Sequence, residues 1–352
     1  MSSRRQFLAA AAAVAACAVS TRPAGIAAPQ PGPPAAPLKP RRLSRGDTVG
    51  IVAPAGATFF PVELDIAQET FEAMGLTVRV GEHVLARRGY LAGDDEARAN
   101  DLNRFFADPT LAGMVALRGG WGSARLLPHL DYEAVRRHPK VLLGYSDVTA
   151  LSCAVQARAG LVTFHGPVGI SRWNRYNRAW LERVVFRGEA VTFENPKELA
   201  KGELVQREHR IRTIRSGRAR GPLLGGNLTV LTAILGSPYV PDFTGAILFL
   251  EDTDEAPYRV DRMLTQLKLA GILEKVSGVV FGRCTDCGPG EGSYGSLTLE
   301  EILADHVKPL GVPAWHGAMI GHIATQFTLP VGTSVEINAD RGTIRMLEPA
   351  VI

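Results

Sequence analysis

A serine at residue 146 stands in a turn that could present it as a nucleophile. The apolar run 141–143 predicts a buried strand, and a helix is predicted at 148–159, directly after Ser146 and Asp147. Open α/β sheets bind ligands at this point, beside helix N–H groups that can stabilise an oxyanion. The motif differs from a G-x-S-x-G elbow, because Val148 replaces the second glycine. Taken alone, the pattern fits a helix cap at Ser146 or Asp147 better than a nucleophile.

A serine nucleophile needs a base, and three of the eight histidines lie where one could stand. His165 ends a predicted strand, and His316 follows another. His322 lies between two apolar segments, next to Gly321, which allows close backbone approach. Spacing alone does not choose among the three. The other five lie in polar or connecting segments, where a solvated or structural histidine is expected.

Acidic residues gather at the end of the apolar run 247–250. Glu251 and Asp252 follow it directly, and Asp254 and Glu255 come next. One of them could orient a catalytic imidazole. The alternatives are a solvated acidic loop or a Mg²⁺ or Ca²⁺ site, but a phosphate-binding loop and an EF-hand spacing are both missing from the sequence. We therefore expect neither a metal nor another cofactor.

Five segments, in the same order, resemble motifs of the LD-carboxypeptidase family. They are Arg118-Gly119-Gly120-Trp121-Gly122, Gly144-Tyr145-Ser146-Asp147, Gly225-Gly226-Asn227-Leu228, Leu250-Glu251-Asp252 with 258–264, and Gly321-His322. The resemblance runs from about residue 46 to residue 347 and so covers nearly the whole chain after its N-terminal segment. The family includes muropeptide LD-carboxypeptidases and the related microcin C self-immunity peptidases.

The resemblance implies a Ser–His–Glu triad of Ser146, His322 and Glu251. It also makes the backbone N–H groups of Gly120 and Asp147 the expected oxyanion donors. The family's reaction removes a D-amino acid, such as D-Ala, that follows an L-centre in a murein tetrapeptide. In a serine enzyme this reaction passes through an acyl-enzyme.

Such a substrate ends in a carboxylate, so a cation is expected near the site. Arg118 is the candidate, with a structural ion pair as its alternative role. Trp121 and Asn227 are further candidate contacts for the substrate, although packing is the commoner role of a tryptophan. The expected partner is a murein peptide, and the resemblance also suggests a homodimer. The competing functions are a microcin C-type immunity peptidase or amidase, and a catalytically inactive murein-binding protein.

The elements that must position these residues divide into two parts. Strands alternate with helices over 43–165, which predicts an α/β domain with a doubly wound, mostly parallel, Rossmann-like sheet that carries the nucleophile. Residues 166–220 have weak periodicity and are expected to be a connector. Residues 221–352 predict a second α/β domain that carries the glutamate and the histidine. Its tail, over 325–347, alternates in hydropathy and predicts a small antiparallel set.

The N-terminus resembles an export signal. Residues 1–28 contain adjacent arginines at 4 and 5 followed by an Ala-rich apolar stretch, the order typical of a twin-arginine signal. Residues 29–42 are a proline-rich linker. The protein is therefore expected to be exported to the periplasm. A weaker lipobox-like pattern at 14–17 would instead make Cys17 a lipid anchor.

Charge and cysteine content bear on the expected partners and on the role of the cysteines. The formal net charge is +4, and three of the arginines lie in residues 1–28, so the rest of the chain is close to neutral. A nucleic-acid partner is not expected, because it would need a basic surface. Cys153, Cys284 and Cys287 are an odd number and argue against a disulfide framework. For the Cys-x-x-Cys pair at 284 and 287, a loop with an incidental or locally bridged pair is favoured over a redox or zinc site.

Overall fold

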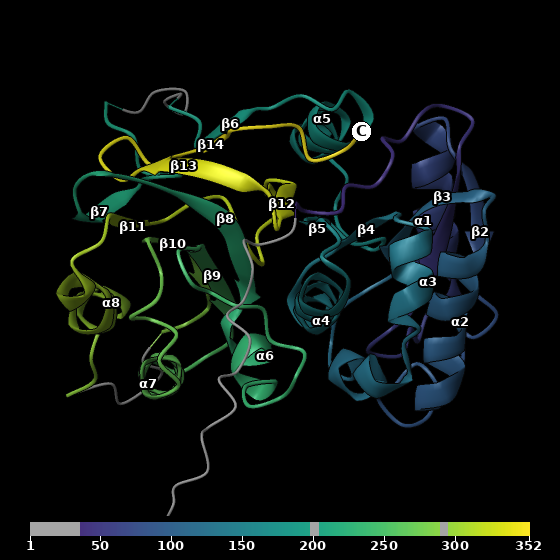
Figure 1. Ribbon diagram of the computed structural model, residues 1–352, viewed down its shortest axis with the longest axis horizontal. Helices are drawn as coiled ribbons and strands as arrows, with labels where there is room; N and C mark the ends of the chain where they lie inside the picture. The colour runs from purple at the N-terminus through teal and green to yellow at the C-terminus, as the bar shows by residue number, and fades with distance from the viewer. Residues whose placement is uncertain (1–35, 198–203, 289–294) are drawn as a thin grey trace, which may run out of the picture. The chain divides into compact units, whose positions relative to one another are not determined.

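The computed structural model describes residues 36–197, 204–288 and 295–352. Residues 36–352 form one compact unit (Figure 1). The predicted export signal, Cys17 and the first part of the proline-rich linker lie outside the described residues.

Six strands form the first sheet, in the order β12-β5-β4-β3-β1-β2. Five of them are parallel, and β12 joins the edge antiparallel to β5. Their sequences are short apolar runs whose residues are mostly buried, as expected for a sheet covered on its faces. The strands are β1 Thr48–Val52, β2 Thr77–Val80, β3 Leu111–Ala116, β4 Val141–Gly144, β5 Thr163–His165 and β12 Leu329–Val331.

Helices connect the parallel strands of this sheet, and their ends match the sequence signals. Helix α1 begins at Pro61, a residue that suits the first helical position, and α4 ends at Gly160, which has a φ of 71°. The helical segments are α1 Pro61–Ala73, α2 Asp95–Ala107, η1 Ser123–His129, α3 Tyr132–Arg137, η2 Ser146–Val148 and α4 Thr149–Ala159.

The second sheet has eight strands, in the order β6-β14-β13-β8-β9-β10-β11-β7. Strands β8 to β11 are parallel, and the strands at both edges are antiparallel. The strands are β6 Thr192–Glu194, β7 Arg212–Arg215, β8 Arg218–Asn227, β9 Ile247–Thr253, β10 Gly278–Thr285, β11 Ala314–His316, β13 Ser334–Asn338 and β14 Thr343–Met346. The remaining helical segments are α5 Arg175–Leu181, η3 Glu182–Phe186, α6 Leu228–Ala233, α7 Pro257–Leu269, α8 Leu299–Val307 and η4 Lys308–Leu310.

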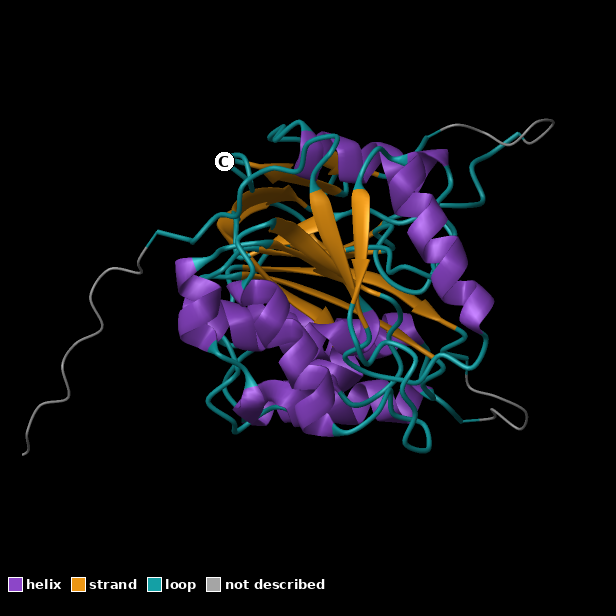
Figure 2. Cartoon of the chain, turned by 90° about the vertical axis from the view of Figure 1, so that its right-hand side faces the viewer, coloured by secondary structure: helices purple, strands orange, loops and turns teal. Residues whose placement is uncertain are grey.

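The α/β class and the mostly parallel first sheet are confirmed, and helices flank the strands (Figure 2). Two segments differ from the expectation. The stretch 166–220, expected to be only a connector, contains β6, β7 and the first residues of β8. In the tail, β13 and β14 pair as expected, but β12 lies in the first sheet. Alternating hydropathy identifies a strand's buried face and does not select the sheet that it joins.

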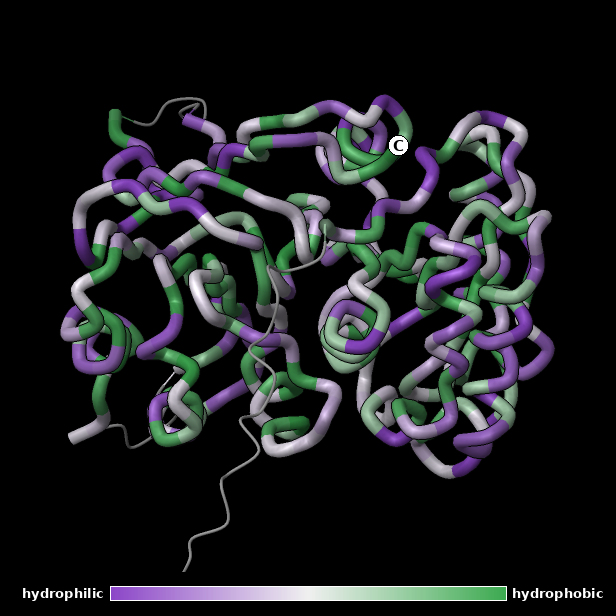
Figure 3. Tube along the Cα trace, viewed as in Figure 1, coloured by the Kyte–Doolittle hydropathy of each residue, from purple (hydrophilic) through white to green (hydrophobic). Residues whose placement is uncertain are grey.

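Hydrophobic residues run through the inner strands of both sheets, whereas the outer strands β7, β13 and β14 carry many hydrophilic residues (Figure 3). Strand β8 shows both characters. Its first half pairs with β13, and its buried second half pairs with β9, so that Asn227 lies opposite Glu251. In the described ranges, no helix combines the length and apolarity needed to cross a bilayer.

Candidate active site

Ser146 lies in a tight turn between β4 and α4. Its φ is +61°, a left-handed conformation that is uncommon for a residue with a side chain. The turn also needs Gly144, because a Cβ there would come within 2.9 Å of both methyl groups of Val148. The capping role that the local pattern favoured is not formed, since the described residues give α4 no side-chain cap. Strain of this kind at a solvent-accessible serine is typical of functional positions.

The structure brings the three predicted triad residues into one hydrogen-bonded chain. His322 Nε2 lies 3.0 Å from Ser146 Oγ, and His322 Nδ1 lies 2.8 Å from Glu251 Oε2. A carboxylate beside Nδ1 favours the tautomer with its proton on that nitrogen. Nε2 is then left with a lone pair directed at the serine hydroxyl, so this arrangement can remove the Ser146 proton.

The Glu251 carboxylate packs against the backbone of the loop that carries His322. Its side chain is fully buried near the end of β9. Gly321 has a φ of +112°, and a Cβ on it would lie 2.6 Å from Glu251 Oε2. The glycine before His322 therefore allows the carboxylate and the loop to pack in contact.

Two opposing effects set the pKa of His322. Burial lowers the pKa, but the hydrogen bond that His322 donates to Glu251 and the charges of Glu251, Asp252 and Asp254 raise it, and the raising effects prevail. The imidazole is therefore a stronger base than a solvated histidine. An imidazolium formed during a reaction would be stabilised by the same carboxylates.

The glycine loop after β3 lies against the nucleophile. A Cβ on Gly119 would come within 2.9 Å of Ser146 Oγ and 3.5 Å of the Asp147 nitrogen. Gly120 has a φ of +113°, and a Cβ on it would contact Gly56. Among the described residues, no acceptor takes a hydrogen bond from the N–H of Gly120 or of Asp147. Both predicted oxyanion donors thus have uncommitted N–H groups, and Gly119, the residue before Gly120, lies against Ser146.

The Asp147 side chain fixes this loop. It is fully buried, and its Oδ2 accepts a hydrogen bond from the Ser123 nitrogen at 2.7 Å. Burial raises the pKa of Asp147, and the hydrogen bonds from Ser123 and Gly122 oppose that rise. This carboxylate therefore ties the nucleophile turn to the end of the glycine loop, in addition to the contact of Gly119 with Ser146.

Arg98 is a supporting residue that the sequence reasoning missed. Its buried guanidinium donates to the carbonyls of Pro54 and Gly122 and pairs with Asp95, so it joins the loops after β1 and β3. Burial lowers the pKa of Arg98, and Asp95 opposes the effect. One signal could have revealed it: Arg98 lies on the same helical face as the buried Leu102, where a charge needs partners.

The three predicted substrate contacts differ in their surroundings. Arg118 is half-buried, and its Nη1 donates to the Ala57 carbonyl at 3.0 Å. Trp121 is 42% exposed and follows the glycine loop directly. Asn227 is only 4% exposed, which is little for a residue expected to touch substrate. Substrate contacts of Arg118 and Trp121 stay predictions.

Asn227 instead holds neighbouring elements of the site together. Its Oδ1 caps α6 by accepting from the Val230 nitrogen at 3.0 Å, and its Nδ2 donates to Asp252 at 3.0 Å. Its backbone nitrogen donates to Thr149 Oγ1 at 2.9 Å, which joins the nucleophile helix to β8. We therefore treat Asn227 as a structural residue of the site. Its predicted contact with substrate stays a prediction.

The other two candidate bases lie in different environments. His165 is buried, and its ring packs edge-on against Phe249 at 5.2 Å. Burial lowers the pKa of His165 to about 4. His316 lies at the end of β11, where burial also lowers its pKa. Of the three candidate bases, His322 is thus the one that lies within hydrogen-bond distance of Ser146.

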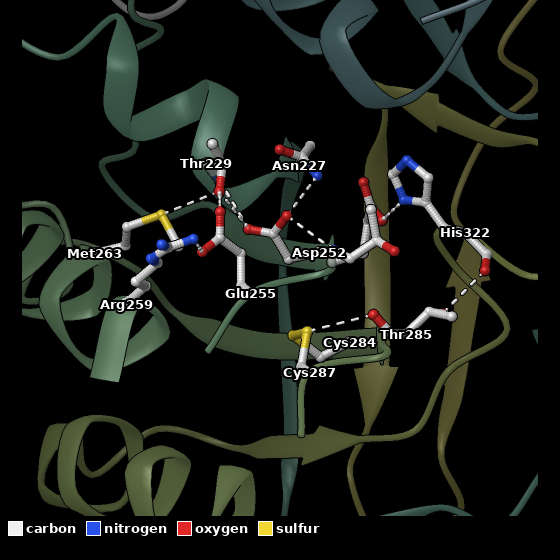
Figure 4. The surroundings of a disulfide bond; sticks show 12 residues. Asn227, Thr229, Asp252, Glu255, Arg259, Met263, Cys284, Thr285, Cys287 and His322 are labelled. Carbon is white, nitrogen blue, oxygen red and sulfur yellow. Dashed lines mark hydrogen bonds and ion pairs between the residues drawn. A yellow bond between two sulfur atoms is a disulfide. The ribbon is translucent and has the colours of Figure 1, made fainter. Parts of the chain in front are cut away.

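The acids that follow Glu251 take supporting roles. Asp252 accepts hydrogen bonds from Asn227 and Thr229, and Glu255 accepts one from Thr229 (Figure 4). Burial raises the pKa of Asp252 to about 6. Within the described ranges, no group of three acidic, histidine or cysteine side chains has an arrangement that could hold a metal ion.

Two family models match the chain. The LD-carboxypeptidase N-terminal domain matches residues 49–166, and the LD-carboxypeptidase C-terminal domain matches residues 220–337. The chain belongs to the LD-carboxypeptidase family. The first matched segment contains Ser146, and the second contains Glu251 and His322.

The match between this LD-carboxypeptidase family member and its named relatives covers most of each relative's length. A probable murein peptide carboxypeptidase of Bacillus subtilis (strain 168) is 37% identical over 310 residues, which is 87% of this chain and 93% of the relative. The murein tetrapeptide carboxypeptidase of Pseudomonas aeruginosa is 32% identical over 306 residues, with coverages of 83% and 94%. The solved structure of the microcin C7 self-immunity protein MccF, in an inactive mutant apo state, has a TM-score of 0.80 at 27% identity. That match covers 90% of this chain and 100% of MccF.

Membership of the LD-carboxypeptidase family makes the chain a peptidase, a hydrolase that acts on peptide bonds. Its relatives include murein carboxypeptidases and MccF-like proteins. The site is consistent with hydrolysis, since it combines a hydroxyl, a base and uncommitted N–H groups.

Proposed function

We propose that the protein is a serine-type LD-carboxypeptidase that removes the C-terminal D-Ala from murein tetrapeptides. The observation that carries the proposal is the continuous chain from Ser146 through His322 to Glu251. Relatives named as murein peptide and murein tetrapeptide carboxypeptidases support the choice of substrate.

The proposed reaction begins with transfer of the Ser146 proton to His322 Nε2. Ser146 Oγ attacks the carbonyl carbon of the scissile amide, and the negative oxygen is stabilised by the N–H groups of Gly120 and Asp147. His322 then gives its proton to the leaving D-amino acid nitrogen, and the C–N bond breaks. An acyl-enzyme on Ser146 remains. Water, activated by His322, hydrolyses the ester and restores the serine.

The shape of the substrate follows from the position of the cleaved bond. A carboxypeptidase must hold a free terminal carboxylate next to the scissile amide. In this proposal Arg118 supplies the cation, since it lies directly before the glycine loop that contacts Ser146. Trp121, whose side chain is part-exposed at the same loop, would cover the substrate.

The proposed place of action is outside the cytoplasm. The twin-arginine pattern in residues 1–28 supports export, and an alternative is lipid anchoring at Cys17. Muropeptide recycling enzymes of this family are typically cytoplasmic. An exported member would instead trim stem peptides of the wall itself or of fragments released from it.

A second candidate is a peptidase of the microcin C immunity type. The structural similarity to MccF, with a TM-score of 0.80, favours it. Export argues against it, because that toxin acts inside cells. A third candidate, a murein-binding protein without catalysis, conflicts with the intact hydrogen-bonded triad.

The test uses the purified protein without its signal and a murein tetrapeptide, followed by mass spectrometry. We expect loss of one alanine residue, and we expect Ser146→Ala to abolish it. An acyl-sulfamoyl adenosine substrate, added in parallel, separates the immunity-type activity. If neither substrate is cleaved and a fluorophosphonate fails to label Ser146, the binding protein without catalysis is the better description.

A further inference from the structure

The end of β10 holds the loop that carries His322. Three alternate residues, Phe281, Arg283 and Thr285, are hydrogen-bonded to residues 317–322. The first two residues use their backbones: the Phe281 carbonyl accepts from the nitrogens of residues 317 and 318 at 2.9 and 3.4 Å, and the Arg283 nitrogen donates to the carbonyl of residue 320 at 2.9 Å. The third comes from a side chain: Thr285 Oγ1 donates to the His322 carbonyl at 2.9 Å (Figure 4). The hydrogen bond that reaches His322 itself thus depends on a hydroxyl group that can be removed by substitution.

Thr285 also holds the strand that carries the triad carboxylate. It pairs with Thr253 in the ladder between β9 and β10, and its carbonyl accepts from the Asp254 nitrogen at 2.9 Å. Glu251 lies in β9, two residues before Thr253. A single residue therefore joins the strand of Glu251 to the loop of His322.

A disulfide brackets Thr285. It links Cys284 to Cys287 across a turn in which Asp286 has a φ of +55° (Figure 4). A left-handed residue with a side chain is unfavourable in a free chain, so a covalent link across the turn restricts the alternatives. The remaining described cysteine, Cys153, is buried and free. Closure of this pair thus fixes the end of β10 next to the triad.

We propose that Thr285, bracketed by the Cys284–Cys287 disulfide, is a positioning residue that holds His322 in line with Ser146 and Glu251. This inference rests on the proposed role of His322 as the catalytic base. Thr285 does not touch the reacting atoms. It fixes the backbone from which the imidazole projects, and small displacements of a catalytic group cost large factors in rate.

Loss of the hydroxyl would free the His322 carbonyl and let the ring drift from its partners. The groups that act on this ring are Glu251, Asp252 and Asp254 from β9 and its following loop, through their charges, with Tyr145 and His165 on the side of the first sheet. The contact with Glu251 depends most on distance, because it is a hydrogen bond. A looser ring therefore has a lower pKa and removes the Ser146 proton less effectively.

The first experiment compares Thr285→Val and Thr285→Ser with Thr213→Val. Thr213 is a matched control, because its hydroxyl also donates to a backbone carbonyl, that of Ala339, at 2.8 Å, in β7. We expect Thr285→Val to lower kcat for the tetrapeptide about 10-fold or more with little change in KM. Thr285→Ser should recover most of the rate, and Thr213→Val should behave like wild type. Equal rates for Thr285→Val and Thr213→Val would overturn the proposal.

The second experiment needs no substrate and reads the histidine directly. Protein labelled with ¹⁵N-histidine is titrated by NMR, and the His322 signal is assigned from its loss in His322→Gln. The pKa of His322 should fall in Thr285→Val and stay unchanged in Thr213→Val. An unaltered His322 pKa in Thr285→Val contradicts the positioning role. Absence of peptidase activity in wild type contradicts the proposed function instead.

A third comparison tests the role of the Cys284–Cys287 disulfide. Cys284→Ser/Cys287→Ser should shift kcat and the His322 pKa in the same direction as Thr285→Val, and by less. Dithiothreitol, which gives two electrons and two protons to the disulfide and becomes a cyclic disulfide, should reproduce that shift in wild type. The double variant should not respond to it. If opening the disulfide leaves both readouts unchanged, the bracket has no part in positioning.

Discussion

The backbone of Gly321 lies against the carboxylate of Glu251, so close that a Cβ at residue 321 would fall 2.6 Å from Oε2. The residue before the proposed base is therefore part of the pocket for the proposed triad acid. Gly321→Ala should push Glu251 away from His322 and lower kcat/KM by about 10²- to 10⁴-fold, as loss of the orienting carboxylate does in other triads.

The control for that variant is Gly311→Ala. Gly311 also has a positive φ, +74°, but a Cβ there would meet nothing within 4 Å. Gly311→Ala carries the backbone cost of alanine at positive φ, about 1 kcal/mol, and Gly321→Ala, at a φ of +112°, carries at least that cost in its free energy of unfolding. Steady-state kinetics should then show a large defect only in Gly321→Ala. Equal activity of the two variants would refute the contact as a functional constraint.

Replacement of Ser146 should separate catalysis from stability. Both Ser146→Ala and Ser146→Gly should be inactive, but glycine tolerates the φ of +61° and alanine does not. Urea unfolding should therefore give Ser146→Gly a free energy of unfolding about 1 kcal/mol higher than that of Ser146→Ala. At Ser152, inside α4, the order should reverse, because glycine destabilises a helix interior relative to alanine.

The dependence of activity on pH should follow His322. The base must be neutral, so kcat/KM should rise with pH and level off above the raised pKa of His322. Glu251→Gln removes the charge that raises this pKa, so the acidic limb should move to lower pH, and the plateau should fall. Asp254→Asn is the control, because Asp254 acts only through its charge and should give a smaller shift in the same direction. Identical limbs in wild type and Glu251→Gln would disprove the coupling.

The two neighbouring histidines should affect stability with opposite signs. The folded pKa of His322 is above its ordinary value of 6.5, so its contribution is fully present below pH 6.5 and is lost as the pH rises through the folded value. His165, with its pKa lowered to about 4, must stay neutral in the fold. Between pH 6.5 and 4 the unfolded chain binds more protons at His165 than the folded chain does. The free energy of unfolding therefore falls as the pH is lowered through this range.

His165→Phe should remove that loss. Phenylalanine keeps an aromatic ring against Phe249 and leaves no buried ring nitrogen, since Nε2 of His165 has no partner among the described residues. Urea unfolding at pH 5 should favour the variant more than it does at pH 8, where His165 is neutral in both states. If the difference between variant and wild type is the same at both pH values, the low pKa assigned to His165 is wrong.

Much of the fold was visible in the sequence because its signals are local. The apolar runs of β4 and β9, and the helix predicted at 148–159, depend on residues close together in the chain. Pairing between distant segments was not visible. The edge strand β12 joins the first sheet, which its alternating hydropathy could not specify.

The proposed site was predicted from motif order, not from local physics. The turn around Ser146 looked like a helix cap, and three histidines were equivalent by position. Their separation by the fold needs long-range packing, such as the contact between Gly321 and Glu251. The buried Arg98 was missed, because a single arginine in a charged helix resembles a solvated residue.

The place of β12 has a consequence for how the protein is made. The edge of the nucleophile sheet is supplied by Leu329–Val331, after every strand of the parallel core of the second sheet. Synthesis proceeds from the N-terminus, so the sheet that carries Ser146 stays unfinished until residues 329–331 have been made. A nascent chain that stops before residue 329 therefore exposes the open edge of β5, and the nucleophile sheet closes only after the second sheet's parallel strands have been synthesised.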